Sequence, residues 1–119
     1  MQEQGSKTIF DTASEGEGST GLSEQSVESL ASLLRVLADP TRIRLIEILE
    51  ARGRATVSSL TASLPISQQS VSRQLGVLFQ AGIVARRREG IWVQYELRDW
   101  SGPWVLRQLA EGLADGGRG

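Results

Sequence analysis

The sequence predicts a mainly α-helical domain with a small β-hairpin, an α+β fold in the order helix, helix, helix, helix, strand, strand, helix. Two observations support this prediction. Along most of the chain, apolar residues recur at steps of three and four, which is the spacing of one helix face. In residues 91–97 apolar residues instead alternate with others, and a short turn separates this run from residues 83–88, which is typical of a hairpin.

The composition indicates one small domain without the usual catalytic groups. A chain of 119 residues is the size of a single hydrophobic core. Cysteine and histidine are both absent, so the chain has no disulfide, no thiolate nucleophile and no imidazole base. We therefore expect a protein that is not an enzyme and that binds no cofactor.

Charge and hydropathy limit the partners of the protein. The 13 basic and 14 acidic side chains leave a net charge of −1, so only a local cluster of charge can indicate nucleic acid. No apolar run approaches the roughly 20 residues of a membrane span. The first residues lack the basic-then-apolar order of a signal peptide. We expect a cytoplasmic protein without a membrane partner.

The first 21 residues differ in composition from the rest of the chain. They are rich in Gly, Ser, Thr and Glu, and they contain one Lys and four acidic residues. Too little apolar surface is present to offset the entropy of ordering. The sequence predicts a disordered acidic tail over residues 1–21, a folded domain over 22–115 and a flexible end over 116–119. An acidic arm that folds onto a partner is the alternative.

Two helices are predicted at the start of the folded part. The first begins after Ser23, a residue suited to cap a helix N-terminus. Its apolar face comprises Val27, Leu30, Leu33, Leu34 and Leu37. The second begins where Asp39 can cap and Pro40 fits a first helical position that needs no N–H donor. Gly53 supplies a left-handed stop near its end, and a broad apolar stripe indicates a buried scaffold helix.

The next two helices are short and are joined by a tight turn. Thr56 is a suitable cap for a helix that must end at Pro65, because proline lacks the amide donor and clashes with the preceding turn. Ser67 begins another helix that runs to about Gln80. Two helices joined in this way form a helix-turn-helix candidate.

The second helix of this pair has a polar face that suits a DNA groove. Val71, Leu75 and Leu78 share one side, and the other side carries Gln, Ser and Arg without acidic residues. Gln can pair with adenine, Arg can contact guanine through two hydrogen bonds, and Ser can donate to phosphates. A solvated surface without a ligand is the alternative interpretation of the same face.

The hairpin that follows is predicted to have a two-residue turn at Glu89 and Gly90. Arg86, Arg87 and Arg88 precede the turn, where they would extend towards DNA phosphates or an adjacent minor groove. Protection of a strand edge against aggregation is the alternative role of such a cationic run. The arginines favour DNA binding because they follow a helix-turn-helix candidate with a polar face.

The chain ends in another amphipathic helix. After Asp99 the helical pattern extends to Ala114, with Pro103 in or near the first turn. Trp100 and Trp104 lie one helical turn apart, and paired aromatic residues at that spacing usually pack at an interface. A small apolar effector pocket between subunits is the alternative.

Three segments of the chain carry a family pattern. They are LADPTRIRLIEIL at 37–49, SQQSVSRQLGVLFQAGIV at 67–84 and RRREGIWVQYEL at 86–97. In this order and spacing they closely resemble the ArsR/SmtB family of bacterial winged-helix transcription regulators. The resemblance implies a winged helix-turn-helix fold, binding of double-stranded DNA at an inverted repeat, and a homodimer whose first and last helices form the interface.

The resemblance also assigns roles to individual residues. The recognition helix, which enters the major groove in relatives, would contact DNA through Gln68, Gln69, Ser70, Ser72, Arg73 and Gln74. The wing would contact DNA through Arg86, Arg87, Arg88 and Gly90. The dimer interface would contain Leu30, Leu33, Leu34, Leu37, Trp100, Trp104, Leu106, Leu109 and Leu113. Gln74 departs from the family pattern, since relatives often have histidine there.

The usual metal-sensing ligands of the family are missing. The stretch that matches the cysteine-bearing helix of relatives is 54–60, which has no cysteine. Other relatives use Asp and His pairs on the last helix, where this chain has Asp99, Glu111 and Asp115 without histidine. The helical positions of these acids do not converge well, so we expect surface acids and no metal site. Weak binding of a metal such as nickel or manganese is the alternative.

The sequence therefore predicts a homodimeric, sequence-specific DNA-binding regulator that represses transcription from an inverted-repeat operator. One alternative is a transcriptional activator or co-regulator whose sensing of a small molecule or weakly bound metal is delegated to a partner protein. Another is a winged-helix module that docks on protein and does not read DNA. Salt-sensitive DNA affinity distinguishes the two classes, because neutralising phosphates releases counterions.

Overall fold

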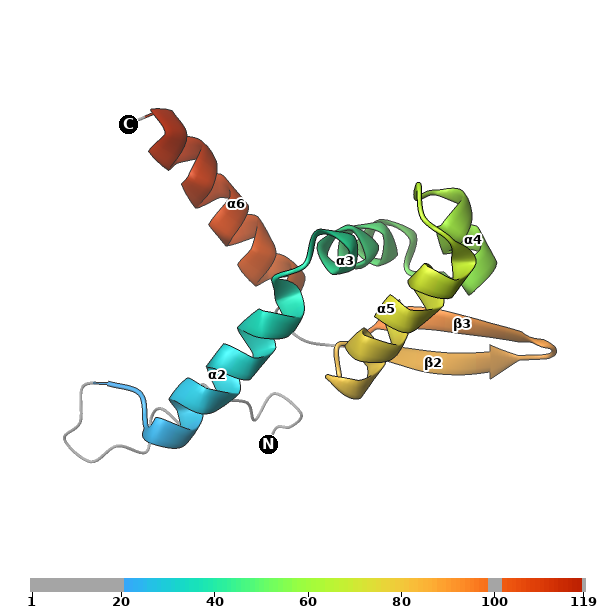
Figure 1. Cartoon of the computed structure of the whole chain (residues 1–119), viewed down its shortest axis with the longest axis horizontal. Coiled ribbons are helices and arrows are strands. Elements are labelled where there is room, and N and C mark those ends of the chain that lie inside the picture. The colour runs from blue at the N-terminus through green and yellow to red at the C-terminus, as the bar shows by residue number, and fades with distance from the viewer. Residues whose placement is uncertain (1–20, 99–101, 119) are drawn as a thin grey trace.

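The computed structural model of the chain describes residues 21–98 and 102–118 (Figure 1). Its helices and strands in chain order are α2 (Glu24–Leu37), α3 (Pro40–Arg52), β1 (Arg54–Ala55), α4 (Val57–Ala62), α5 (Gln68–Gln80), β2 (Val84–Glu89), β3 (Trp92–Leu97) and α6 (Gly102–Arg118). The predicted mainly helical fold with a β-hairpin is confirmed, and the short strand β1 is an addition to it. The predicted tail over residues 1–21 lies almost entirely outside the described residues, so the domain division stays a prediction.

The four predicted N-caps account for where four of the helices begin. Ser23, Asp39, Thr56 and Ser67 each have extended backbone, and each side-chain oxygen accepts a hydrogen bond from the backbone N–H three residues further on. The donor–acceptor distances are 3.1 to 3.3 Å. These contacts satisfy amide donors that the first turn of a helix leaves without an intrahelical partner.

The strands form one antiparallel sheet in the order β1-β3-β2. β2 and β3 form the predicted hairpin, and β1 adds two residues along the other side of β3. Arg54 lies opposite Glu96, and Ala55 lies opposite Tyr95. A strand of two residues is too short to show alternation, so the sequence pattern does not reveal it. Its pairing ties the segment between α3 and α4 to the sheet.

The predicted turn of the hairpin is wrong by one residue. Glu89 is the last residue of β2 and lies opposite Trp92, so the two turn residues are Gly90 and Ile91. Gly90 has a φ of +66°. Glycine at the first position of a two-residue turn is typical of hairpins, because it adopts positive φ without a steric penalty. The first strand therefore includes Glu89, and Ile91 stands at the tip of the hairpin.

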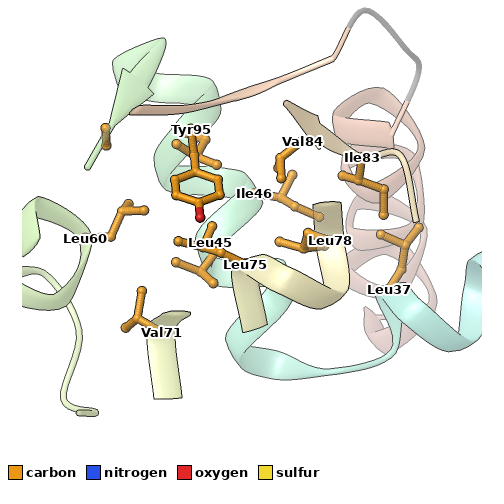
Figure 2. Packing of buried hydrophobic residues seen from close by; sticks show 12 residues of the cluster. Leu37, Leu45, Ile46, Leu60, Val71, Leu75, Leu78, Ile83, Val84 and Tyr95 are labelled. Atoms are coloured by element: carbon orange, nitrogen blue, oxygen red, sulfur yellow. The ribbon is translucent and has the colours of Figure 1, made fainter. Parts of the chain in front are cut away.

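The hydrophobic core is built from one side of α3 and α5, from α4 and from the inner face of the sheet. Figure 2 shows side chains from these elements converging on one another. The fully buried apolar side chains are Leu45, Ile46, Leu49, Leu60, Val71, Leu75, Leu78, Ile83 and Val84. α3 contributes three of them, so it is the buried scaffold helix that the sequence predicts.

Helices α2 and α6 extend away from this core in different directions (Figure 1). Leu37 at the end of α2 is buried, and Leu106 of α6 packs against the core. Beyond these anchors the two helices expose Val27, Leu34, Trp104, Leu109 and Leu113. α6 continues to Arg118, past the predicted end at Ala114. None of the helices within the described ranges is long and apolar enough to cross a membrane.

We expect Ile46→Ala to destabilise the fold strongly and Ile91→Ala to leave it nearly unchanged. Ile46 is 1% exposed in the core and Ile91 is 82% exposed at the hairpin tip, so the same truncation leaves a cavity only at Ile46. The free energy of unfolding should fall by about 2 to 5 kcal/mol for Ile46→Ala and by less than about 0.5 kcal/mol for Ile91→Ala. Urea unfolding at a fixed protein concentration measures both losses, and equal losses would contradict the core described above.

Candidate nucleic-acid interface

Burial of one side of α5 decides which side faces solvent. Val71, Leu75 and Leu78 are 0% exposed in the core. At about 100° per residue, the opposite side holds five exposed residues, which are Gln69, Ser72, Arg73, Gly76 and Gln80. The helix contains no acidic residue, so none of its own side chains repels a phosphate. This is the face that the sequence predicts to point outward.

The predicted recognition residues differ in their exposure to solvent and in their contacts within the chain. Gln68, Gln69, Ser72 and Arg73 are exposed, whereas Ser70 is half-buried. Arg73 forms no hydrogen bond or ion pair with any residue that the structure describes. All the donors of its guanidinium are therefore available to a ligand.

Gln74 is already engaged within the chain. Its Oε1 accepts a hydrogen bond from Nε of Arg42 at 2.8 Å. Arg42 also donates to the carbonyl oxygen of Val36 at 2.8 Å. Because Arg42 lies in the first turn of α3, these contacts join α3 to α5 and to the end of α2. The sequence pattern does not reveal this role of Arg42, since a contact across 32 positions leaves no periodic signal.

Strand alternation separates the three wing arginines. Arg86 lies opposite Tyr95 and Arg88 lies opposite Val93, so both share the sheet face that contacts the helices. The Arg86 guanidinium carbon lies 3.9 Å from the centre of the Phe79 ring at the end of α5, an arrangement with cation–π attraction. Arg88 is exposed near the tip, where it donates a 3.5 Å hydrogen bond to a turn carbonyl.

Arg87 lies on the opposite face of the sheet, in a network of ion pairs. Its Nη2 donates to Oε2 of Glu96 at 2.9 Å. Arg54 contacts both Glu96 at 3.6 Å and Glu89 at 2.9 Å. The hydrogen bond raises the pKa of Arg87 and holds the pKa of Glu96 below its ordinary value. The charge of Arg87 is thus already balanced, whereas Arg88 forms an ion pair with no residue in the described ranges.

An open groove runs beside the outward face of α5. It has a volume of about 640 Å³ and is lined by Val36, Arg73, Gly76, Val77, Phe79, Gln80, Ala81 and Arg86. Arg73 and Arg86 bring two positive charges to it. A Cβ at Gly76 would meet no atom within 4 Å, so packing inside the chain does not require glycine there. The geometry leaves room at Gly76 for close approach of another molecule.

The tip of the wing carries two apolar residues that the sequence pattern does not assign to an interface. Ile91 is 82% exposed and Trp92 is 57% exposed. Both follow Gly90 in the chain, and Trp92 lies opposite Glu89, on the sheet face that carries Arg87 and not on the face that carries Arg88. Large apolar side chains exposed next to each other are suited to contact another macromolecule. Only the pairing of the strands places Ile91 in the turn, where it has few neighbours.

A second exposed surface covers α2 and α6. Among the residues predicted at the dimer interface, four are 41% to 77% exposed, which are Leu34, Trp104, Leu109 and Leu113. Three more are partly buried, which are Leu30, Leu33 and Leu106. Leu37 is 4% exposed and packs in the core of this chain, so it offers little area to a partner, and its place at a dimer interface stays a prediction. Trp100 lies outside the described residues.

The acidic residues of the described ranges do not gather into a metal site. Within residues 21–98 and 102–118, no three of them come together to hold an ion. Glu111 and Asp115 are exposed on α6, and Asp99 lies outside the described residues. The expectation that these acids bind no metal stays a prediction.

Comparison with known proteins assigns this geometry to a family. A family model described as a helix-turn-helix domain matches residues 37–87. The chain is 39% identical over 83 residues to the arsenic resistance transcriptional regulator ArsR1 of Pseudomonas putida. The matched part is 70% of this chain and 64% of that protein, just under two thirds of its length. It is 34% identical over 94 residues to a transcriptional repressor SmtB homolog of Synechocystis sp., which is 79% of this chain and 70% of that one.

A solved structure has the same fold. The crystal structure of the transcriptional repressor BigR from Xylella fastidiosa matches with a TM-score of 0.64 and 30% identity, over 78% of this chain and 91% of that chain. These relatives are transcriptional regulators and not enzymes. In sequence and in fold, the chain belongs to the ArsR/SmtB family of winged helix-turn-helix transcriptional regulators.

Proposed function

We propose that the protein is a homodimeric, sequence-specific DNA-binding repressor that acts at an inverted-repeat operator. The observation that carries this proposal is the outward face of α5, which is exposed, free of acidic residues and flanked by a cationic wing. Such a face suits a major groove, where base edges need hydrogen-bond partners and phosphates need positive charge. The relatives named as repressors support the sign of regulation. Acting on a bacterial promoter requires a cytoplasmic location.

The residues of α5 divide between base contacts and phosphate contacts. Gln69 and Arg73 lie on the outward face, where Gln can bind adenine and Arg can bind guanine through two hydrogen bonds. Gln68, Ser70 and Ser72 lie in the first turns of the helix. Their short hydroxyl and amide groups are suited to phosphates, which position the protein on the duplex.

The exposed apolar surfaces of α2 and α6 supply the dimer that an inverted repeat requires. Leu34, Trp104, Leu109 and Leu113 would leave water when these helices pack against their copies in a second subunit. Twofold symmetry would then present two copies of α5 to two half-sites, about one helical turn of DNA apart.

Effector binding, in this proposal, uses no thiolate or imidazole ligand. The chain has no cysteine and no histidine. The link to arsenic in the name of ArsR1 is a property of that relative. Release from the operator would then depend on a small molecule, on a metal weakly held by oxygen ligands or on a partner protein.

Selection from a random DNA library tests the proposal. The full-length protein should enrich sequences with two related half-sites in inverted orientation, and should bind the enriched site more tightly than a scrambled copy. Affinity should fall steeply with salt, because each neutralised phosphate releases counterions. The exposed Ile91 and Trp92 favour a second candidate function, docking on a protein. Failure to enrich any DNA sequence would support that candidate.

Arg73→Ala should weaken binding to the selected site by about 1 to 3 kcal/mol and relax the preference at one base pair, because in this proposal Arg73 reads a base. Arg44→Ala is the matched control, since Arg44 is exposed on α3 and paired with Glu47. Its affinity should stay close to that of the wild type. Titration of the selected and scrambled DNA measures these effects. Equal losses on the two DNAs would reassign Arg73 to a phosphate.

Arg88→Ala should weaken binding to all DNA and make the log–log salt dependence shallower by about 0.9, the value for one phosphate contact. Arg87→Ala should have a smaller effect, because Glu96 already holds that guanidinium. Dissociation constants over a series of salt concentrations give both slopes. If Arg87→Ala had the larger effect, the ion pair with Glu96 would have to open when DNA binds.

Leu109→Glu should convert the dimer into monomers, because it would place an unpaired charge inside the interface. Gln108→Glu is the matched control, since it adds the same charge at the next exposed position, about 100° around the helix. That variant should stay dimeric. Sedimentation equilibrium measures the mass of both. A Leu109→Glu protein that still dimerised would remove this part of α6 from the interface.

A further inference from the structure

Arg42 connects the three helices α2, α3 and α5. Its Nε donates to Oε1 of Gln74 at 2.8 Å, and its Nη1 donates to the carbonyl oxygen of Val36 near the end of α2, also at 2.8 Å. Nε also lies 3.7 Å from Oδ2 of Asp39, the N-cap of α3. The Arg42 side chain is only 21% exposed. Its position is therefore set by contacts inside the chain.

These contacts determine which end of the Gln74 amide is free. A glutamine amide can present either its oxygen or its NH₂ group to a ligand. A guanidinium has donors and no acceptor, so the amide oxygen must face Arg42. Within the described residues, no group accepts a hydrogen bond from the NH₂ group. Gln74 is half-buried and directly follows the exposed Arg73 in α5.

We propose that Arg42 is a positioning residue for DNA recognition, which holds Gln74 as a hydrogen-bond donor to an acceptor on the DNA. This inference rests on the proposed function and adds a specificity element to it. The acceptor is either a phosphate oxygen or an acceptor atom on a base edge, because both offer a lone pair to an N–H group. The two-bond pairing of Gln with adenine is disfavoured at this position, since the charged Arg42 competes for the glutamine oxygen.

A purely fold-stabilising role for Arg42 makes a different prediction. The same guanidinium holds the end of α2 and the side chain of Gln74, so its loss could loosen the joint between helices without changing any DNA contact. In that case Arg42 and Gln74 would affect DNA affinity independently, and the group on DNA that the protein senses would stay the same. Two measurements therefore distinguish the roles. One is whether the losses of DNA affinity in the Arg42 and Gln74 variants are additive, and the other is whether the variants still respond to a change in the contacted DNA group.

The full-length protein and the DNA site selected above provide the test. Arg42→Gln and Gln74→Ala should each weaken binding about tenfold, as expected for loss of one hydrogen bond to the DNA. The double variant with both substitutions should have the same DNA affinity as whichever single variant binds more weakly. Arg44→Gln removes the same charge from the same helix and should stay within about twofold of wild type, because its exposed ion pair contributes little. Arg42→Lys should bind more tightly than Arg42→Gln, since the ammonium keeps the positive charge and N–H donors but lacks the planar fork that reaches two acceptors.

Chemical changes in the DNA distinguish the two kinds of acceptor. A methylphosphonate neutralises one phosphate, and 7-deazaguanine removes the N7 acceptor of one guanine. Wild-type protein should lose affinity when one of these probes replaces the contacted group. That loss should disappear in both Gln74→Ala and Arg42→Gln. If Arg42 only stabilised the fold, Arg42→Gln would respond to the probe as wild type does.

Two results would overturn the proposal while wild-type protein keeps its DNA preference. One is additive losses in the double variant, and the other is an Arg42→Gln protein that binds as well as Arg44→Gln. Thermal unfolding and sedimentation show whether each variant keeps its fold and dimer. If Arg42→Gln does not fold, Gln74→Ala and Arg42→Lys on the modified DNA decide the question. A wild-type protein without any DNA preference would overturn the proposed function instead.

Discussion

The packing of α5 against α3 is the interaction on which the rest of the structure depends. It removes Val71, Leu75 and Leu78 from water, and each such side chain contributes about 1.5 to 3 kcal/mol when it is fully buried. The same packing leaves the side of α5 that carries Arg73 for solvent. It also brings the first turn of α3 beside α5, where Arg42 contacts Gln74. The candidate DNA-binding surface is thus a direct result of how the core forms.

Local signals made most of the fold predictable. Each N-cap is a residue whose side chain bonds the first turn of its own helix, so the helix starts depend only on neighbours in sequence. The predicted position of the hairpin turn was wrong because two-residue turns at Glu89-Gly90 and at Gly90-Ile91 both fit the alternation along β3. Only the positive φ of Gly90 and the pairing of Glu89 with Trp92 distinguish them.

The candidate site was predictable in its faces and not in its contacts. Helical periodicity was sufficient to place Arg73 on the outward side of α5, because that side lies opposite a buried stripe. The bond between Arg87 and Glu96 depends on strand register, and the bond between Arg42 and Gln74 depends on how two helices approach. No short window of sequence contains such information. The burial of Leu37 in the core was not predictable for the same reason, since burial depends on the whole chain.

The two faces of the hairpin differ in electrical character. On the outer face, Arg54 and Arg87 are matched by Glu89 and Glu96, so opposite charges cancel locally. The face towards the helices carries arginine on β2 without an acidic partner across the strand pair. A polyanion that diffuses close to the protein therefore meets uncompensated positive charge on that face of the hairpin. In the proposed complex with DNA, this asymmetry would favour one orientation of the duplex during the encounter, before any base is contacted, and would raise the association rate.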